Sequence, residues 1–178
     1  MEQLEIASHI QAAFPDEVKG INEFRGQVSM TVKKGRIKDI MSRLWAAPEF
    51  YFDFLEDLCG ADYLGRKEPR FEVVYTLHSM KHRHKIRIKA EVSESDCTIA
   101  SVTSIWAGAN WHERECYDLF GITFIGHPDH RRILMPEDWE GHPLRKDYPM
   151  QSDLGDREWP GFKAVVETAK KNKRYEVR

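Results

Sequence analysis

The sequence predicts an α/β protein of the α+β type, with helices packed on a mixed, largely antiparallel sheet and an extended, proline-rich C-terminal arm. Three observations predict this class. Segments with helical and strand periodicity alternate through most of the 178 residues. Residues 71–77 and 83–89 alternate apolar and polar side chains around a short link, as an antiparallel hairpin does. Five of the eight prolines lie after residue 126, which makes long regular elements improbable there. We therefore predict an α/β body at 1–125 and an arm with a basic tail at 126–178.

The first part of the body is predicted to contain two helices and a strand. Apolar residues recur at helical spacing until Pro15, which ends the first helix. Residues 28–33 alternate in polarity and predict a half-buried strand. Residues 37–44 carry one apolar stripe, and Pro48 blocks continuation of this second helix. The aromatic-rich residues 50–55 then predict a buried turn or short strand packed on that helix.

The hairpin has a second strand with an unusual charge pattern. Four cations fall on one side of it: Arg83, Lys85, Arg87 and Lys89. Two interpretations stay open. This side is a docking or nucleic-acid surface, or it is the solvated face of an edge strand, where Lys and Arg discourage pairing between edges. The edge-strand interpretation describes the commoner arrangement.

The last part of the body predicts one more helix between two short extended segments. Apolar residues in 99–105 indicate a short strand or turn. A helix follows Asn110, which is expected to cap it together with Glu113 in a capping box. The helix ends at Gly121, because glycine adopts the left-handed conformation of a C-terminal cap. Residues 122–125 predict a brief strand.

Charge and cysteine content exclude several classes of function. Twenty-seven basic and 29 acidic residues give a net charge of −2, so we expect no nucleic-acid partner, although residues 163–178 hold six basic and two acidic residues. The sequence shows no secretion signal and no run of about 20 apolar residues that a membrane helix needs. Three widely spaced cysteines predict a reducing compartment and no iron–sulfur cluster: Cys59, Cys97 and Cys116.

The polar residues after residue 110 suggest two kinds of chemistry, zinc binding and acid–base catalysis. His112 and Cys116 are four residues apart, with His127 and His130 nearby, but this spacing matches no zinc-ligand motif. Arginines surround the carboxylates of the same region, which keeps carboxylates ionised and favours an ion-pair network over acid–base catalysis. This network would pin the arm to the helix or to a partner. The carboxylates concerned are Glu113, Glu115 and Asp118.

Motifs of self-contained enzymes are missing from the sequence. It has no G-x-S-x-G nucleophile motif, no G-x-G-x-x-G and no G-x-x-x-x-G-K-[ST] phosphate loop. The arm nevertheless carries large apolar residues, which a chain does not keep exposed without a surface to cover them. These features predict an interaction subunit.

A long stretch of the chain resembles a known family. The resemblance lies in four ordered runs, ANWHERECYDLFGI (109–122), GHPD (126–129), RRIL (131–134) and PEDWEGHPLRKDYP (136–149). They resemble the signature of the C subunit, or 30 kDa-type subunit, of proton-pumping NADH:quinone oxidoreductase, respiratory complex I. A match of this length is more specific than a short motif. Cys116 and His130 depart from the usual pattern at positions that affect packing.

The resemblance implies a non-catalytic scaffold protein in the peripheral arm of that enzyme. Such a protein supports electron transfer from NADH to quinone coupled to proton translocation, and the chain itself is expected to have no catalytic centre, cofactor or metal. FMN and iron–sulfur clusters are expected in partner subunits. The implied partners are the other peripheral-arm subunits, chiefly the D subunit, which resembles the large subunit of hydrogenases, and the subunits that bear clusters. The implied location is the cytoplasmic side of the bacterial inner membrane, held through the complex.

Two sets of residues are predicted to carry the interface. The ion-pair network is expected to comprise Glu113, Arg114, Glu115, Asp118, Arg131, Arg132, Arg145, Lys146 and Asp147. The apolar anchors are expected to be Trp111, Tyr117, Phe120, Trp139 and Tyr148. The alternative is a homologous subunit of a membrane-bound hydrogenase or deazaflavin-dependent dehydrogenase complex, or a free-standing RNA-binding module.

Overall fold

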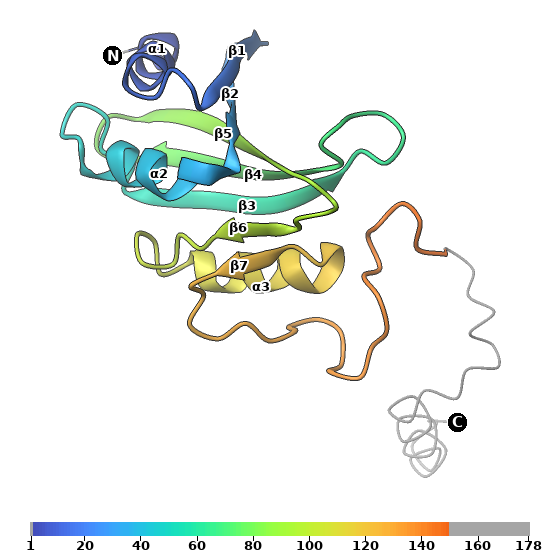
Figure 1. Ribbon diagram of the computed structural model, residues 1–178. Helices are drawn as coiled ribbons and strands as arrows, with labels where there is room; N and C mark the ends of the chain where they lie inside the picture. The colour runs from blue at the N-terminus through green and yellow to red at the C-terminus, as the bar shows by residue number, and fades with distance from the viewer. Residues whose placement is uncertain (1, 150–178) are drawn as a thin grey trace, which may run out of the picture. The chain divides into compact units, whose positions relative to one another are not determined.

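The computed structural model describes residues 2–149 and has the predicted α+β architecture (Figure 1). Contacts group Met1–Asp147 into one compact unit, so the first part of the predicted arm lies in the same unit as the body. The basic tail lies outside the described residues. The elements are α1 (Gln3–Ala13), β1 (Val18–Phe24), β2 (Gln27–Lys33), the 3-10 turn η1 (Lys34–Arg36), α2 (Ile37–Ala46), β3 (Phe54–Asp62), β4 (Phe71–Ser79), β5 (His84–Val92), β6 (Thr98–Ala100), α3 (Ala109–Phe120) and β7 (Thr123–Ile125).

Five strands form the main sheet in the order β1-β2-β5-β4-β3. The predicted hairpin is confirmed, because β4 and β5 pair antiparallel over their whole length. β2 pairs parallel with β5, while its other neighbour, β1, is antiparallel. The cationic strand β5 is therefore central, and the interpretation of its charges as protection of a sheet edge is wrong. Figure 1 shows the small parallel pair β6–β7 and α3 on the β3 side of the sheet.

The core lies on one face of the sheet. Met30, Ile88, Tyr75 and Leu58 are aligned across four strands by the pairing register, and all four are buried. The buried apolar residues of α1, α2 and α3 belong to the same cluster. The opposite face carries Lys85, Arg87 and Lys89 of β5, and within residues 2–149 part of this face forms a groove.

Three local predictions differ from the structure. β1 is not predicted by the sequence pattern, and residues 54–62 form a full strand rather than a short one. Asn110 lies inside α3, whose N-cap is Gly108, so the capping box is wrong. The predicted end of α3 is confirmed, since Gly121 has φ +74° and its N–H donates to the Tyr117 carbonyl at 2.7 Å. No helix within residues 2–149 is long and apolar enough to cross a membrane.

Candidate interaction site on α3 and the arm

Asp118 organises the contact between α3 and the arm. Its carboxylate accepts hydrogen bonds from the backbone N–H groups of three consecutive arm residues, 133–135, at 2.7–3.0 Å. Arg132 adds an ion pair at 2.6 Å. Burial by itself raises the pKa of this carboxyl, but the hydrogen bonds from Met135 and Arg132 outweigh burial and hold the pKa below its usual value. Asp118 is therefore an ionised, fully satisfied anchor for the arm.

Arg114 and Arg132 of the predicted network hold backbone carbonyls. Arg114 donates from Nε to the carbonyl of Arg131 at 3.1 Å and from Nη2 to that of Arg132 at 3.0 Å. The Arg131 side chain pairs with Asp129 at 2.6 Å on the surface. Arg132 also donates to the carbonyl of Trp139 at 2.9 Å. These contacts fix the path of the arm beside α3.

The C-terminal end of α3 receives the next part of the arm. Arg145 Nε donates to the Phe120 carbonyl at 2.7 Å, and the guanidinium lies over the Phe71 ring at 5.1 Å from its centroid. His142 Nδ1 lies 3.0 Å from the Asp118 carbonyl, to which it donates. These donors satisfy carbonyl groups that a helix leaves unpaired at its C-terminus.

A buried arginine that the sequence analysis does not identify fixes the end of this unit. Arg70 pairs with Asp62 at 2.8 Å and with Asp147 at 2.7 Å, and the Lys146 N–H donates to Asp62 at 2.8 Å. Burial raises the pKa of Asp62, but hydrogen bonds from Arg70 and the backbone lower it to about 2. The sequence did contain a signal for this ion pair. Arg70 lies directly before the apolar strand β4, and a charged side chain that is buried there needs a partner of opposite charge.

Glu113 differs most from its predicted role. Its side chain is fully buried, and Oε1 accepts a hydrogen bond from the Val102 N–H at 2.7 Å instead of pairing with an arginine. Oε2 and the Tyr75 hydroxyl are both buried without a hydrogen-bond partner in the described part of the chain. Burial raises the pKa of Glu113 to about 7. The expectation that arginines keep this carboxylate ionised is therefore wrong.

The remaining predicted residues lie at different depths. Trp111 is 64% exposed, with Arg114 over its ring at 5.6 Å, and Glu115 is also exposed. Tyr117 is half-buried and packs on the His130 ring at 4.2 Å. The half-buried ring of Phe120 lies against Gly60, where a Cβ atom would come within 2.6 Å of it. Two anchors in the arm, Trp139 and Tyr148, are half-buried.

The four possible zinc ligands do not assemble. His130 Nε2 accepts a hydrogen bond from the Phe124 N–H at 3.0 Å, and burial lowers the pKa of this imidazole. His127 accepts from the Asp129 N–H and contacts the Asn110 carbonyl. Within residues 2–149, no three His, Cys, Asp or Glu side chains are placed to hold a metal ion. The histidines instead hold the turn that leads into the arm.

Comparison with known proteins finds a matching family model and relatives that cover most of the chain. The family model described as "Respiratory-chain NADH dehydrogenase, 30 Kd subunit" matches residues 30–154. The C subunit of the NADH-quinone oxidoreductase of Roseiflexus castenholzii is 55% identical over 148 residues, covering 83% of this chain and 84% of the relative. The C subunit of the same enzyme in Geobacter metallireducens is 47% identical over 80% of this chain and 86% of its own.

Solved structures share the fold. The trypsin-resistant fragment (1–134) of Nqo5 is 33% identical, with a TM-score of 0.64 over 72% of this chain and 99% of the fragment. A chain of the membrane-bound sulfane sulfur reductase, an archaeal respiratory membrane complex, is 21% identical with a TM-score of 0.71, covering 89% of this chain and 92% of its own, which shows similarity of fold alone. On the family match and the C-subunit relatives, the chain belongs to the family of the 30 kDa subunit of respiratory-chain NADH dehydrogenase.

Proposed function

We propose that the chain is the C subunit of an NADH:quinone oxidoreductase and acts as a non-catalytic scaffold in its peripheral arm. The observation that carries this proposal is the family match over residues 30–154, which spans most of the sheet, α3 and the described part of the arm. Relatives named for this subunit match four fifths or more of the chain. These names favour NADH:quinone oxidoreductase over a hydrogenase or deazaflavin-dependent complex and over an RNA-binding module.

The proposed scaffold role rests on how the charged residues are used. Asp118, Arg114 and Arg132 direct their hydrogen-bonding groups to the arm, and this holds a surface in one shape. Glu113 has the pKa of a general acid or base, but its side chain has no contact with solvent or with a substrate that comes from solvent. We therefore propose that the chain supports electron transfer by positioning its neighbours, because transfer depends on cofactors held at fixed separations.

The proposed assembly follows from the same family membership. We place FMN and the iron–sulfur clusters in partner subunits, and we name the D subunit, which resembles the large subunit of hydrogenases, and the subunits that bear clusters as neighbours. The chain would then lie on the cytoplasmic side of the bacterial inner membrane and be held there through the complex. In this arrangement it donates and accepts no electron itself.

The test is purification of the tagged full-length chain from solubilised membranes. We expect it to bring down the other subunits together with NADH:quinone reductase activity, and we expect the chain alone to have no such activity. Recovery of the chain without companions, or turnover by the chain alone, would contradict the proposal. Retention on RNA with loss at high salt would favour the nucleic-acid alternative.

An exposed anchor offers a sharper version of this test. Trp111→Ala removes an aromatic side chain that is 64% exposed, so we expect folding stability to change by less than about 0.5 kcal/mol. We expect the amount of assembled complex to fall, while turnover per assembled complex stays normal. Phe24→Ala is the matched control, because Phe24 is also 64% exposed and also has an arginine over its ring. Normal assembly with lost turnover would refute the scaffold role.

A further inference from the structure

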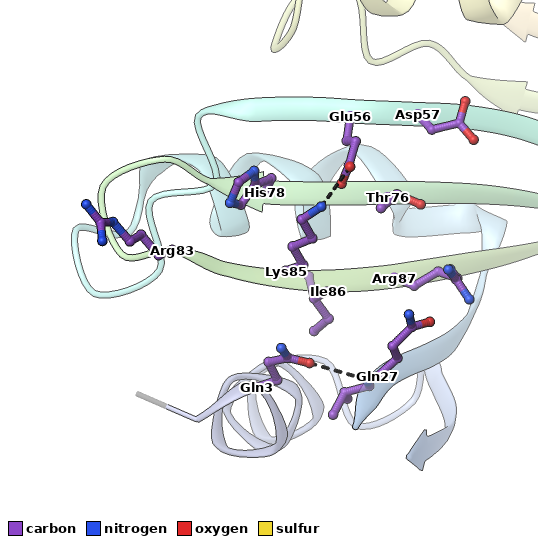
Figure 2. Close-up of a pocket in the computed structure, with 11 residues that line it drawn as sticks. Gln3, Gln27, Glu56, Asp57, Thr76, His78, Arg83, Lys85, Ile86 and Arg87 are labelled. Atoms are coloured by element: carbon purple, nitrogen blue, oxygen red, sulfur yellow. Dashed lines mark hydrogen bonds and ion pairs between the residues drawn. The ribbon is translucent and has the colours of Figure 1, made fainter. Parts of the chain in front are cut away.

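We propose that the open face of the five-stranded sheet is a second interface, on which Arg87 binds a carboxylate of a neighbouring subunit of the same complex. This inference rests on the proposed function and adds a surface on the sheet, next to the predicted anchors on α3. The surface is a groove over β3, β4 and β5, and Figure 2 shows its lining side chains. The predicted partner is a protein surface of mixed charge.

The register of the sheet places Arg87 in the middle of this face. Arg87 is paired with Ser29 on β2 and with Thr76 on β4, and Thr76 is paired in turn with Asp57 on β3. One residue with a short hydroxyl side chain therefore flanks Arg87 on each neighbouring strand. The Ser29 hydroxyl donates to the Asn22 carbonyl at 3.4 Å, whereas the Thr76 hydroxyl makes no hydrogen bond within residues 2–149. Arginine binds a carboxylate in a planar, bidentate geometry, and hydroxyl groups beside it supply further hydrogen bonds. Arg87 and Thr76 thus supply donors for a carboxylate.

Arg87 differs from the other cations of β5 in its pairing. Lys85 pairs with Glu56 at 2.7 Å, an ion pair drawn in Figure 2, and Lys89 lies 3.5 Å from Glu72. Arg87 makes no ion pair or side-chain hydrogen bond with any residue in the range 2–149. Arg87 is therefore a half-buried cation in the centre of the sheet, and the lysines on either side of it both have an acidic partner. A partner protein can neutralise the charge of Arg87.

The acidic residues of the groove restrict the kind of partner. Asp57 is exposed at the β3 side, where its Oδ1 lies 3.6 Å from His112 Nδ1, and the adjacent Glu56 pairs with Lys85. A polyanion such as a nucleic acid would meet these carboxylates on β3, two strands from Arg87, and be repelled. A protein surface with an acidic side chain facing Arg87 and a basic one facing Asp57 matches both charges. Complementarity of this kind fixes which partner binds and in what register.

The first test compares two charge reversals in the tagged full-length chain. Arg87→Glu is expected to lower recovery of companion subunits from solubilised membranes at least fivefold. Arg66→Glu is the matched control, because Arg66 is an exposed arginine outside the groove with no side-chain hydrogen bond or ion pair within residues 2–149, and its recovery should equal that of the wild type. Equal recovery of companions with both variants would overturn the inference.

The second test leaves Arg87 unchanged, so its result does not depend on whether the Arg87→Glu variant folds. A photo-crosslinking residue replaces Thr76, which flanks Arg87 in the groove, and in a separate control it replaces Lys38, which is exposed on α2. We expect an adduct with another protein subunit from position 76 only. No adduct, or an adduct with lipid, with nucleic acid or with a second copy of the chain, would overturn the inference.

Failure of the inference and failure of the proposed function are distinguishable. If the wild-type chain recovers its companions but Arg87→Glu behaves like Arg66→Glu, then only the interface on the sheet is wrong. If the wild-type chain recovers no companions, both proposals are wrong.

Discussion

Replacing Glu113 with glutamine tests the most unusual buried group of the protein. The carboxyl is fully buried, accepts one hydrogen bond from the Val102 N–H and has a pKa of about 7, against an ordinary value of 4.5. The folded chain therefore keeps this proton at a pH where the unfolded chain has released it. Glutamine has the same shape and can accept the same hydrogen bond, but it does not ionise.

The sign and size of the effect follow from proton linkage. Below pH 4.5 Glu113 is neutral in both states and has no effect on the pH dependence of stability. As the pH rises toward 7, ionisation of the unfolded chain lowers the free energy of unfolding, and above pH 7 the cost levels off at about 3 kcal/mol. The difference in stability between Glu113→Gln and the wild type should therefore grow in favour of the variant by about 2.5 kcal/mol between about pH 5 and about pH 8.5.

Urea denaturation of the full-length chain, followed by tryptophan fluorescence at several pH values, measures this difference. Other titrating groups, among them His130 and His142, affect both proteins equally and cancel in the comparison. Glu115→Gln is the control, because Glu115 lies two residues further along α3 and is exposed. Parallel pH profiles for the wild type and Glu113→Gln would refute the reasoning, since they would mean that Glu113 ionises in the folded protein as it does in the unfolded chain.

Two further substitutions test the packing around α3. Asp118→Ala removes the carboxylate that pairs with Arg132 and leaves three backbone N–H groups without their acceptor, so we expect a loss of about 3 kcal/mol in stability and faster trypsin cleavage after Arg132. An unchanged cleavage rate would contradict the anchoring role. Gly60→Ala places a Cβ atom 2.6 Å from the Phe120 ring and should lower the free energy of unfolding by about 1–3 kcal/mol, whereas Gly20→Ala, with open space around it, should have a much smaller effect. Equal stability of the two alanine variants would rule out this close contact.

The strands that the sequence pattern reveals are those with strict alternation. β2, β4 and β5 alternate buried and more exposed residues along most of their length, and all three are predicted. β3 contains a bulge between Leu55 and Asp57, so its buried residues Leu55 and Leu58 are three apart and the period of two is lost. β1 is an edge strand in which Val18 is the one buried residue, so its sequence carries almost no apolar pattern.

The position of β5 in the sheet could not be predicted from local sequence. Its cations suit an edge strand, but the parallel pairing with β2 joins segments that are far apart in the chain. Two other strands supply part of the compensation, since Glu72 on the adjacent β4 pairs with Lys89, and Glu56 on β3, one strand further, pairs with Lys85. A cationic strand inside a sheet is tolerated when acidic residues lie on the strands beside it. Local periodicity does not contain this information.

In the candidate site, too, the sequence indicates which residues take part but not which groups they contact. The sequence identifies Asp118 and Arg132 as members of an ion-pair network, and the structure brings these two together. It does not reveal that α3 carries two carboxylates in opposite states. Glu113 is buried against the Val102 backbone, whereas the Asp118 carboxylate faces the arm and accepts hydrogen bonds from four donor groups of the arm.

This difference follows from helical geometry. Positions 113 and 118 are five residues apart, which is about 500° of rotation on an α-helix, so the two side chains point in directions about 140° apart. One carboxylate is therefore directed into the core, where burial favours the neutral form, and the other toward the arm, where donors favour the ionised form. Glu113 and Asp118 have the same charged residues near them in the sequence, so composition alone cannot predict that their ionisation states differ. The direction of each side chain decides its ionisation state, and that direction depends on which face of α3 packs against β3 and which receives the arm.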